Sequence, residues 1–333
     1  MNFGIIGAGF IARVHAAAIK NIEGSRVSAI ADVQSERACS FASEFGCDSC
    51  FSAEELLCRE DIDAVIICVP PFLHEKIALQ AISHKKHVLC EKPMALSLSS
   101  CQNMAKAAEN AGVLLTVAQV LRFWPEYRLV HQQVESGAIG DVKMVSAKRL
   151  GQYPSWGEWF KDPEKSGGAL MDLHLHDVDF IVSMLGYDVA PIYSVGHQSS
   201  SGAFEQMFTL LSFANGTKAC VHASNQMPDN YPFTMELNIY GTKGAVELRI
   251  GAGYNIHKEG GAESSVNLYQ NGSMPQLLIP ECDDAYETQL KHFITAVQSG
   301  QSSKAVPVEQ SLEVIRIMEQ IKQALLSGDV VRP

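Results

Sequence analysis

The chain has 333 residues, of which 47% are hydrophobic and 19% are charged, and its formal net charge is −11. This composition is typical of a globular protein and excludes an intrinsically disordered chain. The negative charge argues against nucleic acid as a partner, because that affinity rests on Lys and Arg neutralising phosphates. A chain of this length exceeds what one hydrophobic core usually supports, so we expect two domains.

The N-terminal residues and the cysteines bear on location. The first ten residues, MNFGIIGAGF, contain no basic region and no cleavage site, and no apolar run reaches the roughly 20 residues that span a bilayer. The nine cysteines are scattered and odd in number, which does not suggest a disulfide framework. We therefore expect reduced thiols in a cytoplasmic protein with no membrane partner. Cys47 and Cys50 form a CxxC pair, but no second pair completes a zinc site.

Apolar strand-like segments alternate with helical segments through the first 120 residues. The helical segments include Ile11–Asn21 and Ser97–Asn110. Strands that are apolar throughout and separated by helices predict a doubly wound parallel sheet, covered on both faces. The expected strands are Asn2–Ile6, Val27–Ala31, Ala64–Val69, His87–Cys90 and Val113–Val117.

The pattern changes beyond about residue 125. Apolar and polar residues alternate over Phe233–Tyr240, which predicts a half-buried strand. Asn215-Gly216 separates two strand-like runs and predicts a hairpin, and two amphipathic helices are expected near the C-terminus. Gly251–Met274, rich in Gly, Ser and Asn, is expected to be a long loop with poorly defined strands. We therefore expect an α+β domain with a large, mostly antiparallel open sheet over residues 121–333.

The turn after the first strand has the pattern GxGxxA, from Gly7 to Ala12, and it opens a helix. Gly7 permits a tight turn, and Gly9 lets the backbone approach a pyrophosphate that faces the helix N-terminus. Asp32 ends the next strand, where a carboxylate accepts hydrogen bonds from ribose hydroxyls and repels a 2′-phosphate. We therefore expect a dinucleotide-binding Rossmann domain over residues 1–120, with NAD favoured over NADP.

The stretch Asp172–Asp179 contains two histidines and three aspartates. On a helix, Asp172 and His176 share one face, where the carboxylate can orient the imidazole or hold a substrate. Histidine titrates near neutrality and suits a base that takes a hydroxyl proton. His174 and His176 would converge on a metal ion in a strand, but on a helix they diverge by about 200°. A helix here therefore predicts an acid–base role and no metal site, whereas a strand would favour a metal ion.

Four further motifs accompany this stretch: VPPFLH at residues 69–74, KHVLCEKP at 86–93, RFWPEY at 122–127 and GTKG at 241–244. Together they closely resemble the glucose–fructose oxidoreductase/inositol dehydrogenase/rhizopine catabolism (Gfo/Idh/MocA) family of NAD(P)-dependent oxidoreductases, over essentially the whole chain. Three residues depart from the family pattern. Lys86 stands where a glycine is usual, Val120 where a polar residue is common, and His174 where many members have glycine.

The resemblance implies hydride transfer between a nicotinamide and a secondary alcohol or ketone of a sugar, inositol or related polyol. Lys92 matches the lysine between nicotinamide and substrate hydroxyl in the family. Asp172 and His176 match its DxxxH signature, and Asp179 its following aspartate. These three residues, Lys92, Asp172 and His176, are the expected catalytic residues, with the final base left open between Lys92 and His176. The resemblance also implies a homodimer or homotetramer, assembled through the faces of the second sheet.

The expected contacts fall into two groups. The cofactor contacts are Gly7, Gly9, Phe10, Ile11, Ala12, Asp32, Val69, Pro70, His74, Glu91, Lys92 and Gln119. The substrate contacts are Lys92, Arg122, Trp159, Asp172, His174 and His176. Trp156 and Trp159 could equally be packing residues, Arg122 could pair with an acid instead, and His174 is expected at most to help position substrate.

Two alternative functions stay open. One is an NAD-using glycosidase, in which transient oxidation at one carbon permits elimination at another and the cofactor is regenerated. The other is a non-catalytic regulator that binds a dinucleotide. The presence of Lys92, Asp172 and His176 together argues against the regulator, because it has no need of proton transfer.

Overall fold

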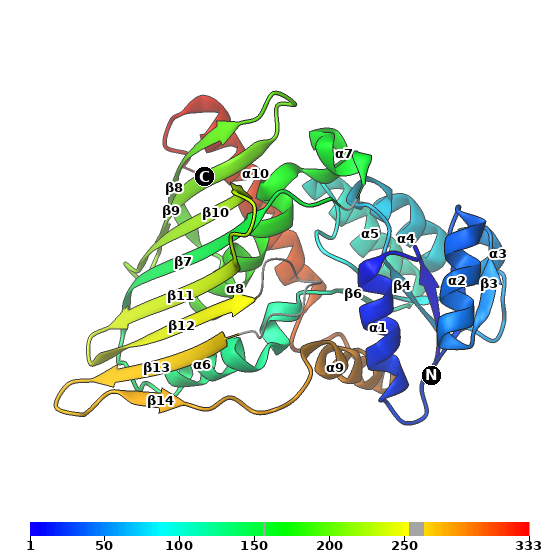
Figure 1. The fold of residues 1–333 in the computed structure, drawn as a ribbon, viewed down its shortest axis with the longest axis horizontal. Helices are drawn as coiled ribbons and strands as arrows, with labels where there is room; N and C mark the ends of the chain where they lie inside the picture. The colour runs from blue at the N-terminus through cyan, green and yellow to red at the C-terminus, as the bar shows by residue number, and fades with distance from the viewer. Residues whose placement is uncertain (156, 253–262, 333) are drawn as a thin grey trace. The chain divides into compact units, whose positions relative to one another are not determined.

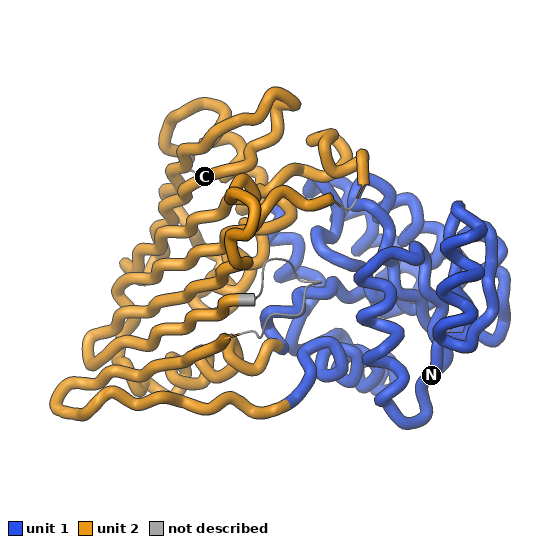
Figure 2. Tube along the Cα trace, in the orientation of Figure 1, with its two compact units in different colours: residues 1–123, 283–315 blue, residues 124–282, 316–333 orange. Residues whose placement is uncertain are grey.

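The computed structural model describes residues 1–155, 157–252 and 263–332. The chain forms two compact units (Figure 2). The first contains Met1–Phe123 and Asp283–Ile315, and the second contains Trp124–Cys282 and Arg316–Pro333. The predicted boundary at residue 120 places 283–315 in the second domain, whereas in the structure they group with the first unit, where Leu290, Phe293 and Ile294 are buried in the core around Phe3 and Ile5.

The first unit contains a six-stranded sheet in the order β3-β2-β1-β4-β5-β6 (Figure 1). All neighbouring strands are parallel, which confirms the predicted doubly wound sheet. The short strand β3, which the sequence did not predict, has only three residues and no apolar run. The strands are β1 (Asn2–Ile6), β2 (Arg26–Ala31), β3 (Asp48–Cys50), β4 (Ala64–Ile67), β5 (His87–Cys90) and β6 (Leu115–Val117).

Helices connect these strands, and the residues at the two ends of α5 explain where that helix begins and stops. Ser97 accepts a hydrogen bond from the Ser100 N–H at the start of α5, and Gly112 ends the same helix in the left-handed conformation. The helices are α1 (Phe10–Lys20), α2 (Ser35–Phe45), α3 (Ala53–Leu57), α4 (His74–Ser83), α5 (Leu98–Ala111) and α9 (Ala285–Ser299), with 3₁₀ turns η1 (Pro71–Leu73) and η2 (Val120–Phe123).

The strand order reverses direction at β1 and β4, which lie next to each other. In open parallel sheets, ligands bind beyond the carboxyl ends of the strands at such a reversal. The glycine turn follows β1, and the segments around Val69 and Lys92 follow β4 and β5. All three therefore lie at the carboxyl edge of this sheet.

The second unit contains an eight-stranded sheet in the order β14-β13-β12-β11-β7-β10-β9-β8 (Figure 1). Only the β7–β10 pair is parallel, so the predicted mostly antiparallel sheet is confirmed. The strands are β7 (Val142–Gln152), β8 (Val189–Gln198), β9 (Phe204–Phe213), β10 (Lys218–Met227), β11 (Phe233–Gly241), β12 (Gly244–Ala252), β13 (Glu263–Gln270) and β14 (Gln276–Leu278).

One sequence prediction for this sheet is only partly right. The span Gly251–Met274, expected to be a long loop with poorly defined strands, contains the regular strand β13, which pairs antiparallel with β12 along its length. Val266 and Leu268 bury their side chains on one face, but the polar residues around them hide the alternation. Residues 253–262 of the same span lie outside the described residues.

Two helices and a helical turn pack on this sheet. They are α6 (Pro125–Glu135), α8 (Leu175–Leu185) and the π-helical turn η4 (Leu170–His174). The short elements η3 (Glu158–Lys161) and α7 (Pro163–Ser166) precede η4, and α10 (Val308–Ser327) is the last helix of the described chain.

Within the described residues, no helix combines the length and apolar character needed to cross a bilayer.

Candidate active site

The glycine turn after β1 has the geometry that a dinucleotide requires. Gly7 has φ of +100°, and a Cβ there would lie 2.5 Å from the carbonyl oxygen of Cys68, so only glycine fits. A Cβ on Gly9 would meet no atom within 4 Å, which leaves space above the backbone. Gly9 caps α1 without a side-chain hydrogen bond, and no acidic residue occupies the first turn. The N–H groups at this helix end are therefore suited to a phosphate group.

The residues around this turn support the same use. Ala12 is fully buried, which lets α1 approach the sheet closely, while the Phe10 ring is 43% exposed. Ile11 is half-buried between them. A small buried side chain and an open backbone at one turn are the features that GxGxxA predicts.

Asp32, at the end of β2, is held beside the glycine turn. Its Oδ2 accepts the Ala8 N–H at 2.8 Å, and its Oδ1 accepts the Gln34 N–H at 2.8 Å. Each carboxylate oxygen retains a further lone pair, so the side chain can still accept hydroxyl hydrogens. The structure thus places a negative charge where the sequence expects the adenosine ribose.

His74 joins two segments of the carboxyl edge. The ring is buried, with Nδ1 2.8 Å from the carbonyl oxygen of Pro93 and Nε2 2.8 Å from that of Val69. Burial lowers the pKa of His74, and the two carbonyl contacts act in the opposite direction, because a carbonyl oxygen only accepts a hydrogen bond. Val69 and Pro70 are half-buried at the end of β4. His74 therefore orders the segments that follow β4 and β5, and its predicted cofactor contact stays a prediction.

Lys92 lies two residues after the end of β5 and is half-buried. Its neighbour Glu91 is buried, and Glu91 Oε1 lies 2.7 Å from Nε2 of His15 on α1. The second oxygen of Glu91 accepts the Lys92 N–H at 3.2 Å. The Glu91 side chain therefore acts as an anchor that holds the backbone of Lys92 against α1.

Gln119 follows β6 at the same edge and is buried. Its Oε1 accepts no hydrogen bond from any described residue. A buried carbonyl oxygen without a donor is costly, and a bound ligand with an N–H or O–H group would satisfy it. Together with the open backbone at Gly9, this oxygen fits the predicted dinucleotide.

Arg122, predicted as a ligand contact, has partners among uncharged groups. Its Nη1 donates to the carbonyl oxygen of Ala305 at 3.1 Å and to Oε1 of Gln310 at 2.6 Å. These contacts tie η2 to the segment before α10 and to the first turn of α10, within the first unit. Val120, in the same turn, is buried.

In the second unit, Asp172 and His176 differ from all their neighbours. From Gly168 to Val182 every residue is buried except these two, which are half-buried. Asp172 lies in η4 and His176 in the first turn of α8, so the predicted helix begins with a π-helical turn. Such turns are rare and frequently occur at functional sites. The structure thus leaves partly exposed the two side chains of this segment that the sequence singled out for chemistry.

His174 points into the protein. The ring is fully buried, and Nε2 lies 2.8 Å from Oγ1 of Thr209, which also accepts the Ser194 hydroxyl at 2.8 Å. Burial lowers the pKa of His174 to about 3, with a smaller effect from His222. This geometry describes a neutral structural residue. The predicted substrate contact of His174 gains no support from it and stays a prediction.

The buried His174 predicts a pH-dependent stability. The unfolded ring titrates near pH 6.5 and the folded ring near 3, so the unfolded state binds more protons between these values. The contribution of His174 is therefore fully present above pH 6.5 and is lost as the pH falls. Between pH 7 and pH 5 we expect wild type to lose about 2 kcal/mol more unfolding free energy than His174→Gln. Urea unfolding of both proteins at the two pH values measures this, and equal losses would contradict it.

A buried ion pair anchors the same helix. Arg149 on β7 donates to Asp177 through Nε at 3.0 Å and Nη2 at 2.8 Å, and Nη2 also donates to the Tyr127 hydroxyl at 3.1 Å. Of the three aspartates in the stretch, Asp177 is thus structural. Asp179 is buried as well.

Glu205 on β9 is a candidate that the sequence did not reveal. It is buried, it accepts hydrogen bonds from Asn225 Nδ2 and the Ala169 N–H, and it lies close enough to Asp172 to interact electrostatically. Burial raises the pKa of the Glu205 carboxyl, and Asp172 raises it further. No local motif marks this residue, because the sheet brings it to η4 from more than thirty positions away.

The predicted aromatic contacts are only partly described. Trp159 is half-buried in η3, and its ring lies edge-on to that of Phe160 with centroids 5.7 Å apart. Trp156 lies outside the described residues. Trp159 therefore packs against Phe160, and its predicted contact with substrate stays a prediction.

The fold and the glycine turn define a class: an oxidoreductase with a dinucleotide-binding Rossmann domain and a second α+β unit. Residues 1–119 match the oxidoreductase family with an NAD-binding Rossmann fold, and residues 127–247 match the GFO/IDH/MocA C-terminal domain. The chain belongs to the Gfo/Idh/MocA family, as its motifs indicated.

Individual relatives have different activities. The chain is 26% identical to inositol 2-dehydrogenase of Rhizobium meliloti (strain 1021), over 90% of this chain and 89% of that one. It is also 26% identical to 2,7-anhydro-N-acetylneuraminate hydratase of Escherichia coli (strain K12), over 90% and 78% of the two chains. A 3-ketoreductase from Actinomadura kijaniata, solved with NADP and TDP-benzene, shares the fold with a TM-score of 0.85 at 22% identity, over 98% of both chains.

Proposed function

We propose that this oxidoreductase transfers hydride between NAD and a secondary alcohol or ketone of a sugar, inositol or related polyol. The observation that carries the proposal is the selective exposure of Asp172 and His176 in an otherwise buried segment. The dehydrogenase relative supports the substrate class. Lys92 at the carboxyl edge of the first sheet supplies the third predicted group.

The chemistry follows from what each side chain can do. A bound nicotinamide accepts or donates the hydride. His176 or Lys92 accepts the hydroxyl proton of the alcohol, because the carbon cannot release hydride while its oxygen keeps the proton. Asp172 accepts a hydrogen bond that orients the imidazole or a substrate hydroxyl. Glu91 and His74 hold the Lys92 segment, so they act as positioning residues.

The cofactor preference is expected to depend on Asp32. Its carboxylate repels a 2′-phosphate, so we expect NAD to bind at least about tenfold more tightly than NADP, a difference of about 1.4 kcal/mol. Asp32→Asn retains an acceptor oxygen and removes the charge. Both Asp32→Asn and Asp32→Ala should therefore reduce the ratio of NAD affinity to NADP affinity. Calorimetric titration with each dinucleotide measures this ratio. Equal or tighter NADP binding by wild type would refute the preference.

A second candidate function has its own support. The hydratase relative aligns with this chain at the same identity as the dehydrogenase. Transient oxidation followed by elimination, as in an NAD-using glycosidase, needs the same hydride and proton-transfer groups. Such an enzyme consumes substrate without net formation of NADH and keeps its cofactor bound through purification.

A substrate panel tests the first proposal against the second. Purified protein is incubated with NAD and with inositols, sugars, sugar acids and aminopolyols in turn, while reduced nicotinamide is followed by absorbance. At least one polyol should produce NADH in proportion to the alcohol consumed. Consumption of a substrate with no NADH would favour the second candidate, and neither activity would favour the dinucleotide-binding regulator.

We further propose that the chain assembles through the exposed face of its eight-stranded sheet. Tyr193 pairs with Leu210 and Val195 pairs with Phe208 across β8 and β9, and all four side chains are 37–50% exposed. Exposed apolar patches of this kind are typical of protein interfaces.

The nine free thiols support the predicted cytoplasmic location, which stays a prediction.

The sheet face gives a testable oligomeric state. We expect wild type to be a dimer or tetramer and Leu210→Glu to be mainly monomeric, because a buried unpaired carboxylate opposes association. Leu326→Glu is the control, since Leu326 is 63% exposed on α10 and not on the sheet. Light scattering after gel filtration gives the masses. A monomeric wild type, or an unchanged Leu210→Glu oligomer, would refute this interface.

A further inference from the structure

Three side chains with metal-binding atoms converge in the first unit, away from the residues discussed above. Glu54 lies on α3, Cys58 directly follows that helix, and His84 directly follows α4. The Cys58 Sγ lies 3.7 Å from Glu54 Oε1 and 3.7 Å from His84 Nε2, and these last two atoms are 3.3 Å apart. We propose that Glu54, Cys58 and His84 bind one zinc ion, with water as the fourth ligand.

The distances agree with tetrahedral zinc. Zn–S, Zn–N and Zn–O bonds of about 2.3, 2.0 and 2.1 Å place ligand atoms of a tetrahedron roughly 3.4–3.6 Å apart. The three observed separations lie within about 0.2 Å of that range. Thiolate, imidazole and carboxylate are all ordinary zinc ligands, and the mixed set favours zinc over calcium or magnesium, which prefer oxygen.

The imidazole of His84 has the tautomer that metal binding requires. Its Nδ1 lies 3.0 Å from the carbonyl oxygen of Gln80. A carbonyl can only accept, so Nδ1 carries the hydrogen, and Nε2, which faces Cys58 and Glu54, is the nitrogen left to bind a metal ion. Histidines that bind metals almost always donate their other N–H in this way. This contact is independent of the cluster itself.

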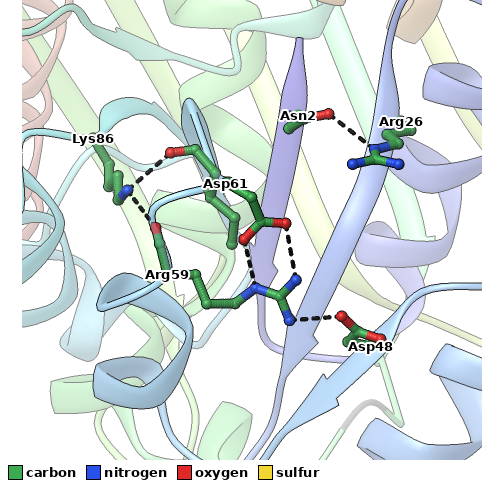
Figure 3. A network of polar contacts seen from close by, with 7 residues as sticks. Asn2, Arg26, Asp48, Arg59, Asp61 and Lys86 are labelled. Atoms are coloured by element: carbon green, nitrogen blue, oxygen red, sulfur yellow. Dashed lines mark hydrogen bonds and ion pairs between the residues drawn. The ribbon is translucent and has the colours of Figure 1, made fainter.

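A network of polar contacts fixes the two segments that carry the ligands (Figure 3). The buried Lys86, two residues after His84, donates through Nζ to the carbonyl oxygens of Arg59 at 2.7 Å and Ile62 at 2.9 Å. Arg59, next to Cys58, donates to both Asp61 oxygens at 2.9 Å. The network thus links the segment after α3 to the segment after α4. It also gives a structural role to Lys86, which departs from the glycine usual in the family.

The place of the cluster in the fold points to a structural ion. Cys58 precedes β4 and His84 precedes β5, so both lie at the amino edge of the sheet, whereas Gly7 and Lys92 follow strands at the carboxyl edge. Such an ion takes no part in hydride transfer. It would stabilise the folded state by binding to it and not to the unfolded chain. The sequence predicts no metal here, because Cys58 and His84 lie 26 residues apart and the three ligands match no motif.

Cobalt titration tests the site, because Co²⁺ bound to a thiolate absorbs in the near ultraviolet. The untagged full chain is stripped with chelator, kept reduced and titrated with CoCl₂, and ZnCl₂ is then added as competitor. We expect one Co²⁺ per chain with a thiolate band that Zn²⁺ abolishes. Cys58→Ser should lack the band, and His84→Gln should bind Zn²⁺ at least about tenfold more weakly.

Two controls complete the experiment. Cys39→Ser removes another exposed thiol, outside the cluster, and should leave the band and the affinity unchanged. Zinc should also raise the unfolding temperature of wild type and Cys39→Ser, but not that of Cys58→Ser. The proposal is overturned if wild type shows no thiolate band, if Cys58→Ser retains it, or if Zn²⁺ stabilises Cys58→Ser as much as wild type.

Discussion

Replacing His176 by alanine is expected to lower kcat by about 10²-fold or more, the usual contribution of a proton-transfer group. NAD affinity and thermal stability should stay near the wild-type values, because His176 lies in the second unit and is half-buried. Lys92→Ala should lower kcat on the same scale. Steady-state kinetics with the best substrate of the panel, together with NAD titration and thermal unfolding, provide the measurements.

Two further variants sharpen this result. Asp172→Asn should also lower kcat, because the amide of asparagine has only one acceptor oxygen, whereas the carboxylate of Asp172 has two. His174→Gly, by contrast, should leave kcat within a few fold and lower the stability, because the buried ring contacts Thr209. If His176→Ala or Lys92→Ala turned over substrate at the wild-type rate, the role assigned to that residue would be wrong.

The second large effect concerns the Arg149–Asp177 pair. Asp177→Ala should reduce the unfolding free energy by about 3–5 kcal/mol, because it leaves a buried guanidinium without its carboxylate. Urea unfolding followed by circular dichroism measures the change. The double variant Arg149→Met/Asp177→Leu removes both charges and should recover much of the loss. The exposed pair Lys161–Glu158 is the control, and Glu158→Ala should change little.

A small effect of Asp177→Ala would show that Arg149 finds another partner or water. In that case the Arg149–Asp177 pair would not be what anchors α8 to β7, and Asp177 would not be a structural residue.

Five of the six strands of the parallel sheet and its glycine turn could be predicted from the sequence. These strands are continuous apolar runs, and β1 and β5 begin and end at the predicted residues. The glycine turn was recognisable because Gly7 and Gly9 meet a local steric requirement that few residues satisfy. Short-range physics determines both features, so a local pattern is enough.

The features that the sequence could not predict depend on long-range contacts. Nothing in the pattern around Phe293 indicates that α9 packs with the first unit against α1. The spacing to Asp172 separates His176 from His174 in the sequence, but only the structure shows that the His174 ring is buried against Thr209. Glu205 and Cys58 likewise acquire their neighbours from distant segments.

The central claim, net hydride transfer from a polyol to NAD, is tested most directly by stoichiometry. The best substrate of the panel is consumed to completion with excess NAD, and the NADH formed and the ketone formed are both counted against the alcohol lost. We expect one NADH and one ketone for each alcohol consumed, with His176→Ala producing both at least about 10²-fold more slowly. Loss of the substrate with no accumulated NADH, and with an elimination or hydration product in place of the ketone, would contradict it.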